Sequence, residues 1–133
     1  MKLISAALTK DQIRQSLENV KRGLPPVKDV TRRMGWKKLK AGERLQFVEK
    51  GQGLKAGETV VRICIVEVVS ARRELLRRML DDLDYGFEET KREGFEHIPG
   101  INGDPAAFVN RFCDNHTGCT AESEITRIEF KYL

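Results

Sequence analysis

Apolar residues recur along this 133-residue chain in two rhythms, one typical of strands and the other of helices. Alternating or β-branched apolar runs predict five strands: 3–8, 27–33, the stretch that follows a turn at 41–42, 59–74 and 123–133. The run at 59–74 is the longest and predicts a central strand. In the closing segment, Ile125, Ile128 and Phe130 interleave with charged neighbours, which predicts a strand with one apolar face.

Apolar residues three or four positions apart predict three helices: 9–23, 74–86 and 105–113. The first begins with Thr9 and Gln12 at capping-box spacing, and a glycine followed by two prolines ends it. The last begins with Asp104 as N-cap and Pro105 in the first turn. The middle helix has an apolar stripe that we expect in the core: Leu75, Leu76, Met79, Leu80 and Leu83.

Loops are predicted where glycines interrupt these patterns. Three glycines in the segment 51–58 predict a loop, without the strand and helix that flank a phosphate-binding loop. The acidic segment 87–104 predicts a helical turn and a loop, and we expect the carboxylates of Asp81–Asp82 and Glu88–Glu89 in solvent. Short helices between strands predict one α+β domain, residues 1–133, built around a small closed antiparallel sheet.

The composition narrows the class of protein. Hydrophobic residues make up 40% and charged residues 33% of the chain, as in globular proteins, and no apolar run approaches the roughly 20 residues of a membrane span. The opening "MKLISAAL" is too short for a signal peptide. Three cysteines, an odd number, suit a reducing compartment, with Cys64 as a buried apolar residue. We therefore expect a cytoplasmic protein without membrane contact.

Charge is distributed unevenly along the chain. The net charge is +4, but residues 20–62 hold 12 Lys and Arg against 4 Asp and Glu. A positive surface on one side attracts phosphate-bearing partners, so RNA or DNA is one expectation. The alternative is an ordinary solvated face with no partner.

The segment "VKDVTRRMGW" concentrates candidate ligand-binding residues. Guanidinium groups of Arg32 and Arg33 can bind phosphate or carboxylate, and the Trp36 indole can stack on a base. Lys37 and Lys38 add charge that would contact a nucleic-acid backbone without reading its sequence. The alternative for Trp36 is a core anchor at the end of the strand.

The same segment holds a candidate catalytic pair, Lys28 and Thr31. Residues three apart in a regular strand point to opposite faces, so a bend beside the two prolines is needed to bring them together. A desolvated lysine beside arginines would lose its proton more easily and could activate the threonine hydroxyl as a nucleophile. A surface lysine and a capping threonine are the alternative.

Cys113, His116 and Cys119 form a C-x2-H-x2-C pattern that suits zinc. A structural zinc site needs four ligands, and only Asp114 or Glu122 lies nearby in the sequence to complete it. The alternative is a helix end that continues into the loop "NHTGCT". We expect no cofactor, and the alternative is a zinc ion at this pattern.

Several spaced motifs together resemble the ASCH domain, most closely its phage and prophage members. In order they are "VTRRMGWKKLKAGERLQFVEKGQGLKAGE", "VVSARRE", "REGF", "AAFVNRFC" and "EITRIEFKYL", and the resemblance covers nearly the whole chain from about residue 8. It implies a fold like the RNA-binding PUA domain, a small β-barrel of about five or six strands with peripheral helices. It also implies a cleft that binds RNA or a modified nucleoside.

The resemblance extends to chemistry. Some bacterial ASCH proteins are amidohydrolases that remove the acetyl group from 4-acetylcytidine with a Lys, Thr and Glu triad, and another relative is a ribonuclease. The family motif K-x2-T-x-R falls on Lys28, Thr31 and Arg33. The glutamate position is matched to Ala107, so Glu93 or Glu96 would have to supply the carboxylate.

Three functions follow as hypotheses. The first to be expected is a module that binds RNA or a nucleoside in a basic cleft through the arginines and lysines of residues 32–38. The second is an amidohydrolase of the 4-acetylcytidine type that uses Lys28 and Thr31. The third is a metal-dependent ribonuclease, which needs carboxylates at the cleft.

Overall fold

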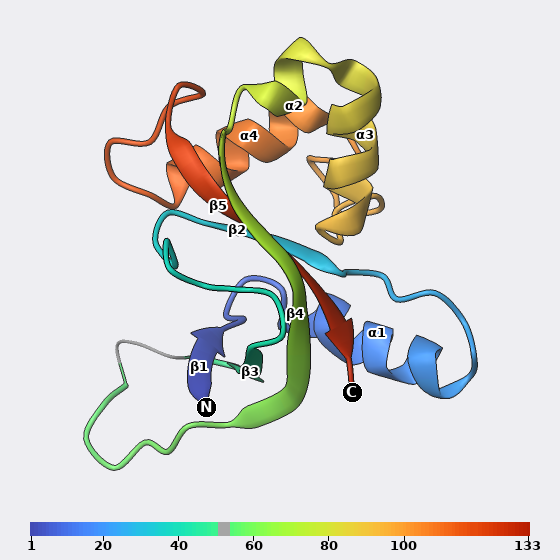
Figure 1. Cartoon of the computed structure of the whole chain (residues 1–133), viewed down its shortest axis with the longest axis vertical. Helices are drawn as coiled ribbons and strands as arrows, with labels where there is room; N and C mark the ends of the chain where they lie inside the picture. The colour runs from blue at the N-terminus through green and yellow to red at the C-terminus, as the bar shows by residue number, and fades with distance from the viewer. Residues whose placement is uncertain (51–53) are drawn as a thin grey trace.

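A computed structural model describes residues 1–50 and 54–133. Within these ranges the chain forms five strands and four helices (Figure 1). In chain order they are β1 (Lys2–Ser5), α1 (Lys10–Lys21), β2 (Val30–Arg33), β3 (Arg44–Val48), β4 (Arg62–Leu75), α2 (Arg78–Asp81), α3 (Leu83–Arg92), α4 (Pro105–Asp114) and β5 (Glu124–Tyr132). No helix among them is long and apolar enough to cross a membrane.

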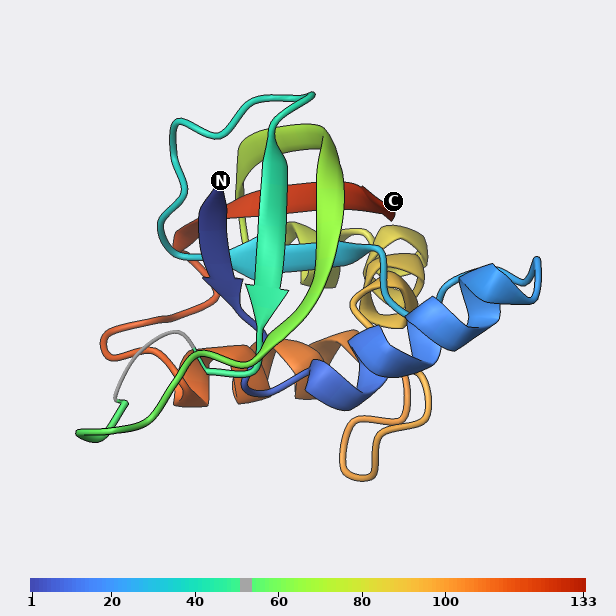
Figure 2. The ribbon, with the colours of Figure 1, turned by 90° about the horizontal axis from the view of Figure 1, so that it is seen from below.

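The five strands form one mixed sheet in the order β1-β3-β4-β5-β2. The pair β1 and β3 is parallel, and the other neighbours are antiparallel. Strand β4 is long enough to pair with β3 along one half and with β5 along the other, and its register shifts between Val68 and Ser70. A bulge bends a strand and increases its twist. The shift in β4 therefore helps the sheet to curl into a half-barrel (Figure 2).

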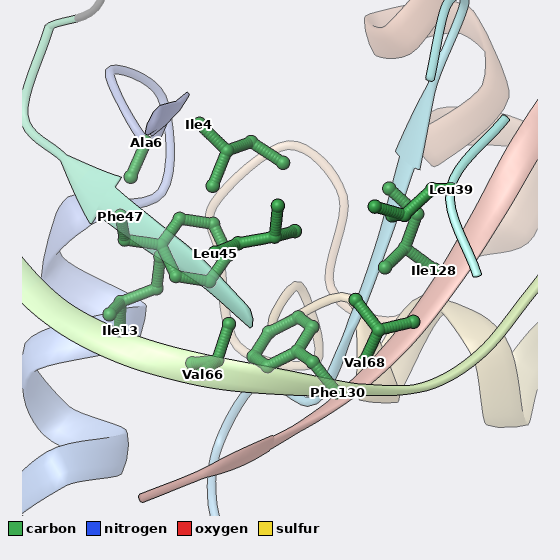
Figure 3. Packing of buried hydrophobic residues seen from close by; sticks show 10 residues of the cluster. All are labelled: Ile4, Ala6, Ile13, Leu39, Leu45, Phe47, Val66, Val68, Ile128 and Phe130. Carbon is green, nitrogen blue, oxygen red and sulfur yellow. The ribbon is translucent and has the colours of Figure 1, made fainter. Parts of the chain in front are cut away.

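The inside of the half-barrel holds an apolar cluster that we call the barrel core (Figure 3). Phe47 of β3 and Phe130 of β5 pack edge to face, with ring centroids 5.1 Å apart. Strands β1 and β4 and helix α1 contribute aliphatic side chains. The members are Ile4, Ala6, Ile13, Leu39, Leu45, Phe47, Val66, Val68, Ile128 and Phe130.

A second apolar cluster lies between the end of the sheet and helices α2, α3 and α4, which gather at the same end of the molecule (Figure 1). It contains Ile125, whereas Ile128 and Phe130 belong to the barrel core. The predicted single apolar face of the closing strand is therefore wrong. Residues 125 and 128 are an odd number apart, so β5 has a buried apolar residue on each face.

The predicted fold class is confirmed: the protein is α+β, with a small barrel-like sheet and peripheral helices. The prediction of a closed antiparallel sheet is wrong in detail, because β1 and β3 are parallel and β1 and β2 form the two edges of the sheet. The predicted helix at 74–86 is wrong in its bounds. Strand β4 continues to Leu75, and two helices follow, the second reaching Arg92 through a segment predicted as mostly loop. Leu76 and Met79 are fully buried as expected, but Leu75 and Leu83 are exposed. Residues 54–61 form no helix or strand, and the first part of the predicted loop, 51–53, lies outside the described residues.

Candidate functional site

A cavity of about 410 Å³ opens between the turn after β1, the segment around β2 and the inner face of α4. Lys28, Thr31, Arg33 and Glu93 all line it. The two residues of the predicted catalytic pair therefore share one cavity, and a carboxylate lies in the same wall.

A bend before β2 brings Lys28 into this wall. The chain bends at Val27, and regular strand begins only at Val30. The Ser16 hydroxyl accepts hydrogen bonds from the backbone N–H groups of Val27 and Lys28, both at 3.0 Å. The Tyr132 hydroxyl donates to the Lys28 carbonyl at 2.6 Å. Because these bonds hold Lys28 outside the alternation of the strand, its side chain and that of Thr31 can line the same space.

The Lys28 side chain is buried and fully hydrogen-bonded. It is 1% exposed, and Nζ donates to the Val30 carbonyl at 2.7 Å, the Glu93 carbonyl at 2.9 Å and Glu93 Oε1 at 3.1 Å. Burial lowers the pKa of Lys28, the charge of Glu93 opposes that change, and the charge of Arg33 adds to it. A lysine whose pKa is lowered has more of the neutral amine that can accept a proton.

Glu93 lies between two cations at the end of α3. Its Oε2 accepts from Arg32 Nη1 at 3.0 Å while Oε1 accepts from Lys28. The next residue, Gly94, has φ +94°, and a Cβ placed there would lie 3.2 Å from the Lys28 Cβ. A glycine is therefore needed for the backbone after Glu93 to approach Lys28 so closely. The same Cβ would lie 3.0 Å from Gln12 Cγ, so close packing on two sides gives a physical reason for the glycine of "REGF".

The carboxylate in the cavity wall belongs to Glu93. The position that the resemblance matched to the family glutamate is Ala107, which has no carboxylate. Ala107 lies on α4 against the second apolar cluster and does not line the cavity. Glu96, the other substitute, is exposed and pairs with Lys91 at 3.9 Å. Glu93 and Lys28 are 65 positions apart, so their contact depends on how α3 packs beside β2.

Thr31 and Arg33 interact directly. The buried Thr31 hydroxyl accepts a hydrogen bond from Arg33 Nε at 3.1 Å. Burial lowers the pKa of Arg33 to about 10, although Glu93 opposes the change. The guanidinium still carries its charge at neutral pH, and a cationic donor on the threonine oxygen stabilises negative charge that develops there.

Arg32 was predicted to bind phosphate, but in the structure its guanidinium is held by ion pairs inside the protein. Its side chain is 0% exposed and ion-paired with Glu93, with Glu74 at 3.1 Å and with Glu89 at 2.6 Å. The three carboxylates come from β4 and α3, far from Arg32 in the sequence. Its role in this arrangement is to hold Glu93 in place.

Glu89 corrects a second expectation. Glu88 is exposed as predicted, but Glu89 is buried and accepts from Arg32 and, at 3.0 Å, from Arg127 Nη2. Burial alone would raise the pKa of Glu89, but the hydrogen bond from Arg127 and the charge of Arg32 outweigh it and lower the pKa to about 2. We call the six buried ionic residues the charged cluster: Lys28, Arg32, Glu74, Glu89, Glu93 and Arg127.

The predicted stacking residue and lysines lie away from the cavity. Trp36 is half-buried against the barrel core, with φ +60° in the turn after β2, so the alternative of a core anchor matches its position. Lys37 and Lys38 are exposed in the same turn. None of the three lines the cavity that contains Lys28 and Thr31.

The three residues of the C-x2-H-x2-C pattern do not converge on one point. Cys113 and Cys119 approach each other with their sulfurs 2.6 Å apart. The His116 ring is not part of this contact: Nδ1 bonds to the Phe112 carbonyl at 2.7 Å, and the ring stacks on Phe112. Within 1–50 and 54–133, no three His, Cys, Asp or Glu side chains are grouped to hold a metal ion. Cys64 is half-buried, and burial raises the pKa of its thiol to about 11.

The cavity wall contains an aromatic row that was not predicted from the sequence. Rings of Phe95, Phe108, Phe112 and His116 follow one another, with centroids 5.4, 6.3 and 4.4 Å apart. All four residues line the cavity, as does Arg111. The spacing of Phe108 and Phe112 was the available signal, because residues four apart share one helix face, whereas His116 lies beyond the end of α4.

Comparisons with known proteins add little to this geometry. No family model matches the chain, and no curated protein is similar in sequence. Among solved structures, the chain is similar to protein EF3133 from Enterococcus faecalis V583, described with the family model DUF984. The two are 11% identical with a TM-score of 0.48, and the match covers 93% of this chain and 69% of that one. A likeness this weak carries no argument about function.

Proposed function

We propose that this chain is an ASCH-type amidohydrolase that removes the acyl group from the amine of a modified nucleoside such as 4-acetylcytidine. The observation that carries the proposal is the common wall of Lys28, Thr31 and Glu93, with Lys28 Nζ 3.1 Å from Glu93 Oε1. The ASCH motifs in the sequence support the same chemistry, because Lys28 and Thr31 match the family motif and Glu93 supplies the carboxylate that Ala107 lacks.

Each residue has a definite part in the proposed reaction. In the proposed reaction Lys28, in its neutral form, releases one of its three hydrogen bonds and accepts the Thr31 hydroxyl proton. Thr31 Oγ1 attacks the acyl carbon, and Arg33 stabilises the negative charge that develops on the acyl oxygen. The amide C–N bond then breaks, the amine leaves with the proton from Lys28, and the acyl group stays on Thr31 as an ester. A water molecule adds to that ester and gives its proton to Lys28. The ester C–O bond breaks, Lys28 returns that proton to Thr31 Oγ1, and the carboxylic acid is released.

The shape of the cavity suits a small molecule better than a nucleic-acid strand. A volume of about 410 Å³ lies in the range of small-ligand pockets, roughly 300–1,000 Å³. The aromatic row gives the cavity an apolar wall against which a planar base can lie. Binding of RNA through Arg32 and Trp36 has less support. Arg32 is ion-paired with Glu89 inside the protein, and Trp36 packs against the barrel core.

Acetate release from 4-acetylcytidine tests the proposal. We expect the purified chain to release acetate, and Lys28→Ala or Thr31→Ala to lower kcat by about 100-fold or more, as for loss of a general base or nucleophile. Lys37→Ala removes an exposed lysine that does not line the cavity and is the matched control.

Circular dichroism and thermal melting separate loss of chemistry from loss of fold. Thr31→Ala is the gentler change, since it removes no charge from the charged cluster. Absence of acetate release by the intact, folded chain, or equal activity of the Thr31→Ala and Lys37→Ala variants, would contradict the proposal. Binding of the nucleoside without turnover would then favour a binding module.

A further inference from the structure

The charges around the cavity are not balanced by the protein. Of the residues that the structure describes, four cationic ones line it (Lys28, Arg32, Arg33 and Arg111), against one carboxylate, that of Glu93. That carboxylate is already bonded to Lys28 and Arg32, and Arg32 is further paired with Glu74 and Glu89. Among the described residues, Arg33 and Arg111 form no ion pair.

The two unpaired guanidinium groups lie at different depths. Arg33 is half-buried beside Thr31, and its Nε is used by the threonine hydroxyl. Arg111 is exposed on α4, and its Nη2 would be 3.6 Å from a Cβ placed at Gly100, which locates its guanidinium beside the turn before α4. Arg33 therefore lies at the end of the cavity where Thr31 would meet the acyl group, and Arg111 lies at the rim.

The aromatic row connects these two positions. Phe108 and Phe112 are four residues apart on α4, with Arg111 beside them on the helix surface that lines the cavity. Asn115 and His116 follow directly after the helix and line the same cavity. A planar ring stacked on this row, with its acyl group toward Thr31, would present its other end to Arg111. An oxyanion at that end would meet a guanidinium with no carboxylate partner, and guanidinium groups bind phosphate through paired charge-assisted hydrogen bonds.

We propose that the natural ligand of this cavity carries a phosphate monoester bound by Arg111, so that it is a nucleoside monophosphate and not an uncharged nucleoside. The inference rests on the proposed function only in taking this cavity as the substrate site. It needs no turnover, because it concerns binding at the rim.

Calorimetric titration with cytidine and with cytidine 5′-monophosphate tests the inference. We expect the monophosphate to bind at least about tenfold more tightly, as one charge-assisted hydrogen-bonded pair allows. Inorganic phosphate should compete with the monophosphate and not with cytidine. Arg111→Gln should reduce the preference to less than about threefold and leave the cytidine affinity unchanged, because the lost contact is with phosphate alone.

Lys37→Gln is the matched control, since it removes the same charge from an exposed position that does not line the cavity. It should keep the preference. Equal affinity of the two ligands, failure of both to bind, or an equal loss of preference in the two variants would overturn the inference. A preference that depends on Arg111 without any acetate release from 4-acetylcytidine would uphold the phosphate subsite and remove only the proposed hydrolysis.

Discussion

The barrel core and the charged cluster occupy opposite faces of strand β5, and β2 beside it adds Arg32 to the charged cluster. In the β2 and β5 pair, Thr31 lies opposite Ile128 and Arg32 lies opposite Arg127. Ile128 points into the barrel core, whereas Arg32 and Arg127 both bond to Glu89 of α3. Both regions exclude water, but one is stabilised by apolar contact and the other by matched charges.

The comparison shows that burial has different consequences in the two regions. An apolar core loses stability in proportion to the atoms removed and the cavity left behind. A buried ionic cluster depends on every partner, because removal of one leaves the opposite charge desolvated and unpaired. The two regions should therefore respond differently to small substitutions and to acid.

The largest effect is expected from Glu89→Gln in the charged cluster. The change keeps the size of the side chain but leaves the buried guanidinium groups of Arg32 and Arg127 without their shared carboxylate. We expect the free energy of unfolding to fall by about 3–5 kcal/mol in urea titrations. Glu88→Gln alters the exposed neighbour and should change it by less than about 0.5 kcal/mol. Equal effects of the two variants would mean that the cluster is not buried as described.

A slightly smaller effect is expected from Leu45→Ala in the barrel core. Leu45 is 1% exposed within that cluster, and truncation leaves a cavity lined by apolar groups. The free energy of unfolding should fall by about 3 kcal/mol, measured by the same titration. Leu24→Ala at a half-exposed position is the control, and it should lose far less.

Acid should distinguish the two regions in the unmodified chain. The pKa of Glu89 is lowered from 4.5 to about 2 in the folded state, so its contribution to stability is complete above about pH 4.5 and is lost as the pH falls toward about 2. Urea titrations over this range should show stability falling with pH. Leu45→Ala should keep the same pH slope, while Glu89→Gln should reduce it. A slope unchanged in Glu89→Gln would assign the acid sensitivity to other groups.

The smallest effect is expected from a surface ion pair. Arg14 Nη1 lies 2.7 Å from Glu49 Oε1, close to the distances in the charged cluster, but the Arg14 side chain is 45% exposed. Arg14→Ala should lower the free energy of unfolding by less than about 1 kcal/mol, since solvent and salt screen the pair. A loss as large as that of Glu89→Gln would show that distance, and not burial, determines the strength of these pairs.

Much of the fold could be predicted because its signals are local. The strand run at 59–74, the cap of Asp104 and Pro105, and the closing strand all appear within a few residues of where the structure has them. The prediction failed at 74–86, because periodicity alone does not show where a strand passes into a helix or that Leu75 and Leu83 lack a core to enter. The alternation of the closing strand also did not show that both of its faces are covered.

By itself, the sequence determined the α+β class, most of the elements and the candidate pair Lys28 and Thr31. Their convergence required the bend that Ser16 and Tyr132 hold, and the carboxylate came from Glu93, 65 positions away from Lys28. Only the tertiary structure showed that Arg32, predicted to contact a ligand, is ion-paired inside the protein. It also showed that Arg33 and Arg111 line the cavity. The physical reason is that patterns of neighbouring residues set local conformation, whereas the partner and exposure of a charge depend on how distant elements pack.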